Sequence, residues 1–235
     1  MQETAKWPAL ESDPAIFTNY FHTIGVDKSV FFKELLTLDY KEFMFFEGPI
    51  LGVILIFQKD INKTTFDDTQ YVDTKSLPFY MKQTPKLDHA CGLIAALHIL
   101  GNSQHLVFDE GSLLQTFFSE GKEVSHEERA KKLEETKKFN DLHKDFAGKG
   151  QSSVPKEGVN NHYVAFINYE GNIYELDGCK KSPVILQKNV MYNDFLDVVI
   201  DEVKRRMTNN EIKDRINLFI CCDENTRLVD FLTDY

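Results

Sequence analysis

The strongest constraint on the fold is a short segment that is apolar on every side of a helix. Residues 93–100 contain leucine, isoleucine and alanine, with His98 as the only polar side chain. A helix that is hydrophobic all round has no face to offer to water, so it must lie in the core. Gly101-Asn102 then supplies a helix stop signal. We therefore expect a central buried helix that ends near residue 102.

The chain is long enough to form one sizeable hydrophobic core. It has 235 residues, 42% of them hydrophobic, which favours a single domain over residues 1–235. Acidic residues outnumber basic ones by 37 to 27, and the formal net charge of −10 argues against a nucleic-acid groove. The longest apolar stretch, residues 49–57, is shorter than the roughly 20 residues that a bilayer requires, and no signal peptide is visible. We expect a cytoplasmic protein, small enough to enter the nucleus, with no nucleic-acid or membrane partner.

Helix and strand signals are interspersed along the rest of the chain. The predicted segments are a helix opening at residues 12–14, a buried strand at 49–57, an exposed loop at 62–76, a charged surface helix from a capping box at 125–128 to about 146, a helix at 196–207 and a strand at 217–222. This order predicts an α/β (α+β) domain.

Cys91 lies where the apolar helix begins, behind a polar turn in which Asp88 is a candidate N-cap. Helix-start amides and the helix dipole favour a thiolate over a thiol. A free thiol is only about 3% ionised at pH 7, so a nucleophile also needs a nearby base. The alternative is that Cys91 merely fills space in the core, as most lone helix cysteines do.

The four cysteines, at positions 91, 179, 221 and 222, have neither the spacing of a metal site nor that of a disulfide framework. They indicate a reducing compartment. We expect no bound metal and no other cofactor.

A predicted β-hairpin supplies a candidate base. Residues 162–169 and 172–177 are rich in β-branched and aromatic residues and flank Glu170-Gly171. If those two residues form the loop, paired residue numbers sum to 341, and His162 is a diagonal neighbour of Asp177 on the same sheet face. A carboxylate that holds one ring nitrogen leaves the other free to take a proton. His89, in the turn before Cys91, is kept as a competitor.

Several segments together resemble the ubiquitin C-terminal hydrolases, which are small papain-like cysteine deubiquitinases. They are residues 7–14, 81–84, 90–93, 162–166 and 174–178, and they occur in the family's order between about residues 7 and 183. The resemblance implies a papain-like antiparallel sheet flanked by helices, in a knotted chain that forms one catalytic domain. It also implies a monomer that acts on ubiquitin.

The resemblance assigns roles to four residues of the predicted site. It implies that Cys91 is the nucleophile, that His162 is the general base and that Asp177 orients it. Gln83 is implied as a side-chain donor to the oxyanion. The reaction is cleavage of small adducts or peptides from the C-terminal glycine of ubiquitin through a thioester.

The resemblance also implies contacts with the substrate. Leu10, Glu11 and Gln151 correspond to ubiquitin-binding positions, and Glu11 suits the arginines in the tail of ubiquitin. Residues 148–161 contain many loop formers and no periodicity, and a loop of this length is usually functional or disordered. The family has a crossover loop over the active site at this place, which limits the size of the adduct.

The chain departs from the family pattern at two positions. Gln83 lies eight residues before Cys91 instead of six, and Pro85, at the sixth, has no N–H to donate. We expect the turn to bulge by two residues and leave Gln83 in place. A weakened oxyanion hole would instead favour a ubiquitin-binding module with weak or no turnover. Cys179 replaces the arginine that usually follows Asp-Gly, and we expect a changed surface contact there.

A third hypothesis uses the same Cys, His and Asp order for another chemistry. It is an acyltransferase that acts on a small substrate. The match at residues 7–14 and the predicted crossover loop argue against it.

Overall fold

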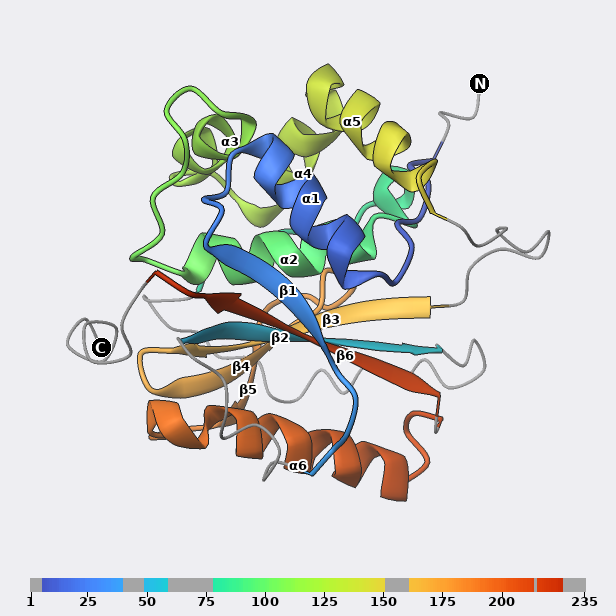
Figure 1. Cartoon of the computed structure of the whole chain (residues 1–235), viewed down its shortest axis with the longest axis vertical. Coiled ribbons are helices and arrows are strands. Elements are labelled where there is room, and N and C mark those ends of the chain that lie inside the picture. The colour runs from blue at the N-terminus through green and yellow to red at the C-terminus, as the bar shows by residue number, and fades with distance from the viewer. Residues whose placement is uncertain (1–5, 40–48, 59–77, 151–160, 214, 226–235) are drawn as a thin grey trace.

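The computed structural model describes residues 6–39, 49–58, 78–150, 161–213 and 215–225. These residues form a six-stranded antiparallel sheet with strand order β1-β6-β2-β3-β4-β5 (Figure 1). The strands are β1 (Val30–Leu35), β2 (Ile50–Gln58), β3 (Asn161–Tyr169), β4 (Asn172–Leu176), β5 (Val184–Gln187) and β6 (Ile216–Asp223). The predicted antiparallel sheet is therefore confirmed.

Helices cover both faces of the sheet. Figure 1 shows α1 to α5 on one side and α6 alone on the other. Their bounds are α1 (Pro14–Ile24), α2 (Cys91–Asn102), α3 (Leu113–Gly121), α4 (His126–Glu135), α5 (Lys137–Ala147) and α6 (Phe195–Thr208), with 3-10 helices at Pro85–Leu87 and Tyr192–Asp194. No helix in these ranges has the length and hydropathy to span a bilayer.

The two faces of the sheet explain why its central strands are apolar on both sides. Alternate residues of β3 enter different cores: Tyr163 and Ala165 pack with α1 and α2, whereas Val164 and Phe166 pack with α6. A strand buried on both faces has no polar alternation, which is why residues 49–57 resemble a continuous apolar run.

Most predicted elements are confirmed. Asp13 caps α1 through its side chain, and α2 ends at Asn102 as expected. Every residue from Leu93 to Leu100 is at most 2% exposed, including His98. The charged segment forms two helices instead of one, because Thr136 leaves the helical conformation between α4 and α5. The loop predicted at 62–76 lies outside the described residues.

The β3–β4 hairpin has the predicted register. Tyr169 pairs with Asn172 and Ala165 with Leu176, so paired residue numbers sum to 341. Glu170 and Gly171 form the loop with positive φ angles of 51° and 72°, which is the backbone conformation of a type I′ turn. The loop length therefore brings the far ends of the two strands together, where His162 and Asp177 lie.

Candidate active site

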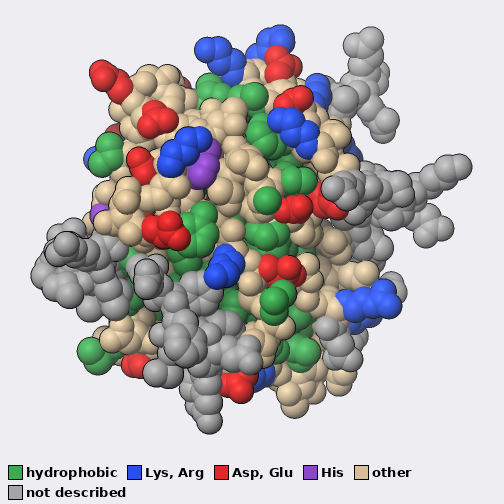
Figure 2. Space-filling model, in the orientation of Figure 1, with side chains coloured by type: hydrophobic (Ala, Val, Ile, Leu, Met, Phe, Trp, Pro, Cys, Tyr) green, Lys and Arg blue, Asp and Glu red, His purple; other side chains and the backbone are tan. Residues whose placement is uncertain are grey.

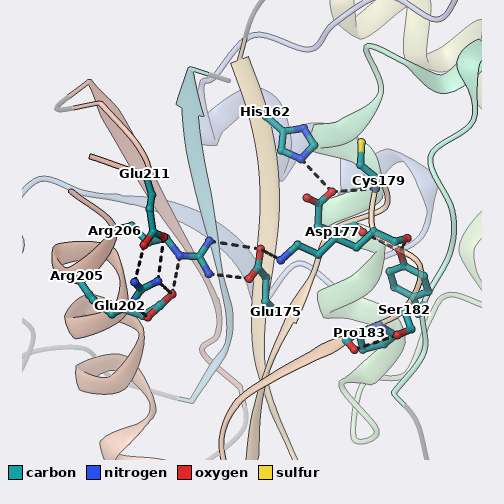
Figure 3. Close-up of polar contacts among 12 residues, drawn as sticks. His162, Glu175, Asp177, Cys179, Ser182, Pro183, Glu202, Arg205, Arg206 and Glu211 are labelled. Carbon is teal, nitrogen blue, oxygen red and sulfur yellow. Dashed lines mark hydrogen bonds and ion pairs between the residues drawn. The ribbon is translucent and has the colours of Figure 1, made fainter. Parts of the chain in front are cut away.

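A histidine and an aspartate form a buried pair at the end of the hairpin opposite its turn. His162, at the start of β3, places Nε2 2.9 Å from Oδ1 of Asp177, the residue after β4. Only 5% of His162 and 3% of Asp177 are exposed. The backbone N–H of Cys179 donates to the same Oδ1 at 2.9 Å. Figure 3 shows the imidazole, the carboxylate and this turn together.

Each residue of the pair stabilises the charged form of the other. Burial alone would lower the pKa of His162, but the Asp177 charge, their hydrogen bond and the Cys91 thiol raise it to about 9. Burial alone would raise the pKa of Asp177, but His162 and the Cys179 N–H lower it to about 2. At neutral pH the site therefore holds an imidazolium beside a carboxylate.

Cys91 lies beside His162. Its side chain hydrogen-bonds with His162, and Sγ is 3.9 Å from the carbonyl oxygen of Asn161. The starts of α2 and β3 lie at the same edge of the molecule (Figure 1). A Cβ on Gly92 would lie 2.9 Å from Cζ of Phe17 in α1 and 3.3 Å from Cε1 of Tyr163 in β3. The glycine after Cys91 thus allows α2 to pack closely against both α1 and β3.

The helix start differs from the prediction. Asp88 does not cap α2; Ala90 is the N-cap residue and gives no side-chain hydrogen bond. Asp88 instead ends the 3-10 helix and pairs with Lys6 at 2.7 Å. Because α2 begins at Cys91 itself, the Cys91 N–H is one of the first-turn donors that have no intrahelical acceptor. Such a donor is suited to an oxyanion.

Gln83 forms hydrogen bonds with the turn before Cys91 and with the turn after β4. Its Nε2 donates to the Asp88 carbonyl at 2.7 Å, and its backbone N–H donates to the Gly178 carbonyl at 2.9 Å. The intervening Pro85–Leu87 segment forms the 3-10 helix, capped by the Thr84 side chain. A Cβ on Gly178 would lie 3.0 Å from the Gln83 nitrogen, so this contact requires a glycine. The role of Gln83 as an oxyanion donor stays a prediction.

The three predicted substrate-binding residues have different environments. Leu10 is 6% exposed and belongs to the core. Glu11 is half-buried, and its carboxylate lies beside Gly150, where an added Cβ would be 2.5 Å from Oε2. Gln151 lies outside the described residues. Contact of these residues with a substrate stays a prediction.

The structure adds supporting residues that the sequence did not reveal. The Tyr80 hydroxyl donates to the backbone carbonyls of Asp177 and Lys180, at 2.7 and 2.6 Å. Glu175, buried in β4, pairs with Lys180 at 3.1 Å and with Arg206 of α6 at 2.7 Å. Tyr80 is almost 100 residues from its partners in sequence, so no local spacing could have indicated this contact.

Comparison with known sequences finds matches to one protein family. A family model described as ubiquitin carboxyl-terminal hydrolase, family 1, matches residues 7–208. A ubiquitin carboxyl-terminal hydrolase of Aplysia californica is 31% identical over 217 residues, which cover 89% of this chain and 99% of the relative. Human ubiquitin carboxyl-terminal hydrolase isozyme L1 is 29% identical over 181 residues, covering 74% and 80% of the two chains.

Structural comparison finds the same fold. The catalytic domain of Trichinella spiralis UCH37, bound to ubiquitin vinyl methyl ester, superposes with a TM-score of 0.74 at 24% identity and covers 93% of this chain and 96% of that one. A second structure of UCH37 from the same organism, with the same ligand, gives a TM-score of 0.69 at 25% identity and covers 93% and 83%.

Proposed function

The chain belongs to the ubiquitin carboxyl-terminal hydrolase family and is a cysteine-type deubiquitinating hydrolase, and from this premise we propose that Cys91, His162 and Asp177 are its catalytic triad. The observation that carries the proposal is the buried His162–Asp177 pair, with the Cys91 thiol hydrogen-bonded to the same imidazole. This arrangement has the nucleophile, base and orienting group of acyl transfer within hydrogen-bond reach.

The triad carries out the reaction in two steps. His162 holds the proton of the Cys91 thiol, so Cys91 Sγ attacks the carbonyl carbon of the C-terminal glycine of ubiquitin as a thiolate, and His162 gives that proton to the departing amine or thiol as the carbonyl bond to the leaving group breaks. Neutral His162 then takes a proton from water, which attacks the thioester and releases ubiquitin and the thiol. Asp177 holds the imidazole in one orientation throughout and favours the imidazolium that forms.

The oxyanion is held by two donors from different segments. One is the Cys91 N–H at the start of α2, and the other is the Gln83 side chain. An amide nitrogen carries two hydrogens, so the bond from Gln83 to the Asp88 carbonyl uses one and leaves the second for the oxyanion. We propose that this bond keeps Gln83 in position despite its longer separation from Cys91.

Ubiquitin is the proposed partner, because the structurally similar UCH37 was solved with ubiquitin vinyl methyl ester. Glu11 is the proposed contact for the basic tail of ubiquitin. Figure 2 shows acidic and basic side chains interspersed on the face that it views. Although the net charge is −10, the described residues of that face do not form one acidic patch. Local pairs such as Glu11 with an arginine are therefore a better basis for recognition than the overall field. A monomer in the cytoplasm is part of the same proposal.

The experiment is covalent labelling with ubiquitin vinyl methyl ester. We expect labelling of the unchanged protein and none of Cys91→Ala. Cys221→Ala is the matched control, because Cys221 is fully buried and burial raises its pKa. Labelling that survives Cys91→Ala would rule out the triad.

A parallel turnover assay on a fluorogenic ubiquitin C-terminal amide tests Gln83. Loss of one oxyanion donor costs roughly 10²–10³ in kcat, so we expect that loss in Gln83→Ala. An unchanged rate would show that Gln83 is no oxyanion donor. Tight ubiquitin binding without turnover of the unchanged protein would select the alternative of a binding module, which the longer separation between Gln83 and Cys91 favours.

A further inference from the structure

A second thiol lies beside the His162–Asp177 pair. Among the residues that the structure describes, His162, Asp177 and Cys179 form a group whose ligand atoms all lie within 4.8 Å of one another. Cys179 is half-buried and follows Asp177 in a tight turn. Figure 3 shows its sulfur beside the carboxylate, on the same side as the imidazole.

These three side chains have the chemistry of a zinc site. Zinc is bound by imidazole nitrogen, thiolate sulfur and carboxylate oxygen in tetrahedral geometry, with bonds of about 2.0 to 2.3 Å, and three protein ligands leave a position for water. Tetrahedral ligands at such distances are roughly 3–4 Å apart, and the ligand atoms of these three residues, all within 4.8 Å of one another, are close to that spacing. A thiolate and a carboxylate together balance the charge of a divalent cation.

We propose that His162, Asp177 and Cys179 form an inhibitory site for zinc or a similar thiophilic divalent cation. A bound ion takes the imidazole nitrogen that faces Asp177 and removes Asp177 from its orienting role, so His162 no longer exchanges protons with Cys91. Binding displaces two protons into solvent, one from the Cys179 thiol and one from Nε2 of His162. The inhibitory effect rests on the proposed triad, whereas the binding itself does not.

One neighbouring cation modulates the site. The Lys82 ammonium interacts electrostatically with Cys179. This positive charge repels a bound cation, so we expect it to weaken the affinity for the metal.

The binding test uses cobalt(II) as an optical probe for zinc, in the Cys91→Ala variant, which has no catalytic thiol. We expect one equivalent to bind and give a thiolate-to-metal charge-transfer band that zinc displaces. The band is lost in Cys91→Ala/Cys179→Ser and weakened in Cys91→Ala/Asp177→Asn. A band that persists in Cys91→Ala/Cys179→Ser would overturn the proposal.

The inhibition test follows turnover of the fluorogenic ubiquitin amide with TCEP in place of a thiol reductant. We expect added zinc to inhibit the unchanged enzyme, EDTA to restore it, and Cys179→Ser to need at least ten-fold more zinc for the same inhibition. Equal sensitivity of Cys179→Ser refutes the site while leaving the triad in place. A cobalt band in a protein without turnover refutes the triad and leaves the site in place.

Discussion

Two buried acids at the end of β4 have different partners. Glu175 and Asp177 are 2% and 3% exposed, and for both the neighbouring positive charges lower the pKa against the effect of burial. Glu175 pairs with Arg206 and Lys180, at 2.7 and 3.1 Å. Asp177 pairs with His162 at 2.9 Å (Figure 3).

The difference between these partners indicates a structural role for Glu175 and a role in proton transfer for Asp177. Arginine and lysine stay charged over the physiological range, so Glu175 is a fixed link between β4 and α6. Histidine changes charge near neutral pH, so Asp177 is coupled to a proton that can move. The identity of the partner, more than burial or position in the strand, therefore decides which acid is suited to the proposed reaction.

The largest expected effect is on turnover in Asp177→Asn. An amide cannot hold the imidazole in the required tautomer or favour its cation, and loss of this interaction in triad enzymes costs roughly 10⁴ in kcat. Circular dichroism gives the folded fraction of each variant, and turnover is expressed per folded enzyme. Glu175→Gln is the matched control, with turnover within about ten-fold of the unchanged enzyme. Equal losses of turnover in the two variants would show that the two acids do not differ in their contribution to the reaction.

The next effect is on stability in Glu175→Gln. The variant leaves the cations of Arg206 and Lys180 buried beside a neutral amide, and breaking a buried ion pair costs about 3–5 kcal/mol in the free energy of unfolding. Urea denaturation measures this loss. The double variant Glu175→Leu/Arg206→Met tests whether the pair is the cause, since replacement of both partners by apolar groups is often neutral. A double variant less stable than either single one would contradict this account.

The third effect is a stability loss at alkaline pH that arises from Asp177 and not from Glu175. The pKa of folded His162 is about 9, above its ordinary value of 6.5. The pairing of His162 with Asp177 therefore makes its full contribution to the free energy of unfolding below pH 6.5. This contribution is lost as pH rises through 9. A shift of this size corresponds to about 3 kcal/mol.

Urea denaturation between pH 6 and 9.5 measures this loss. Asp177→Asn removes most of it, and Glu175→Gln leaves it in place, because Glu175 is paired with Arg206 and Lys180 and not with His162. A pH dependence that survives Asp177→Asn means that another group titrates in this range.

The hairpin and the buried helix could be predicted because their signals are local. A two-residue loop fixes the register of both strands, and this alone brought His162 beside Asp177. A helix without a polar face must be buried, whatever surrounds it. Cys91 was therefore placed at a helix start before its partners were known.

Other features were missed because they depend on distant contacts. The 3-10 helix at Pro85–Leu87 displaced Asp88 from the cap of α2, although its side chain suits an N-cap. β1, α3 and β5 were not predicted; β1 is a short edge strand without strict alternation. Cys179 was expected to change only a surface contact, but the turn after β4 brings its thiol within 4.8 Å of His162 and Asp177.

The smallest expected effect concerns the outer part of the charge network on α6. Arg205 pairs with Glu202 and Glu211, each at 2.7 Å, but 48% of its side chain is exposed, against 11% for Arg206. Exposed pairs are screened by water and salt, so Arg205→Met lowers the free energy of unfolding by less than about 1 kcal/mol. Arg206→Met is the matched control, and it leaves Glu175 with Lys180 alone, so it costs several times more. Urea denaturation at low and high salt measures both, and a comparable loss in the two variants would show that the outer pairs, and not the link to Glu175, hold α6 on the sheet.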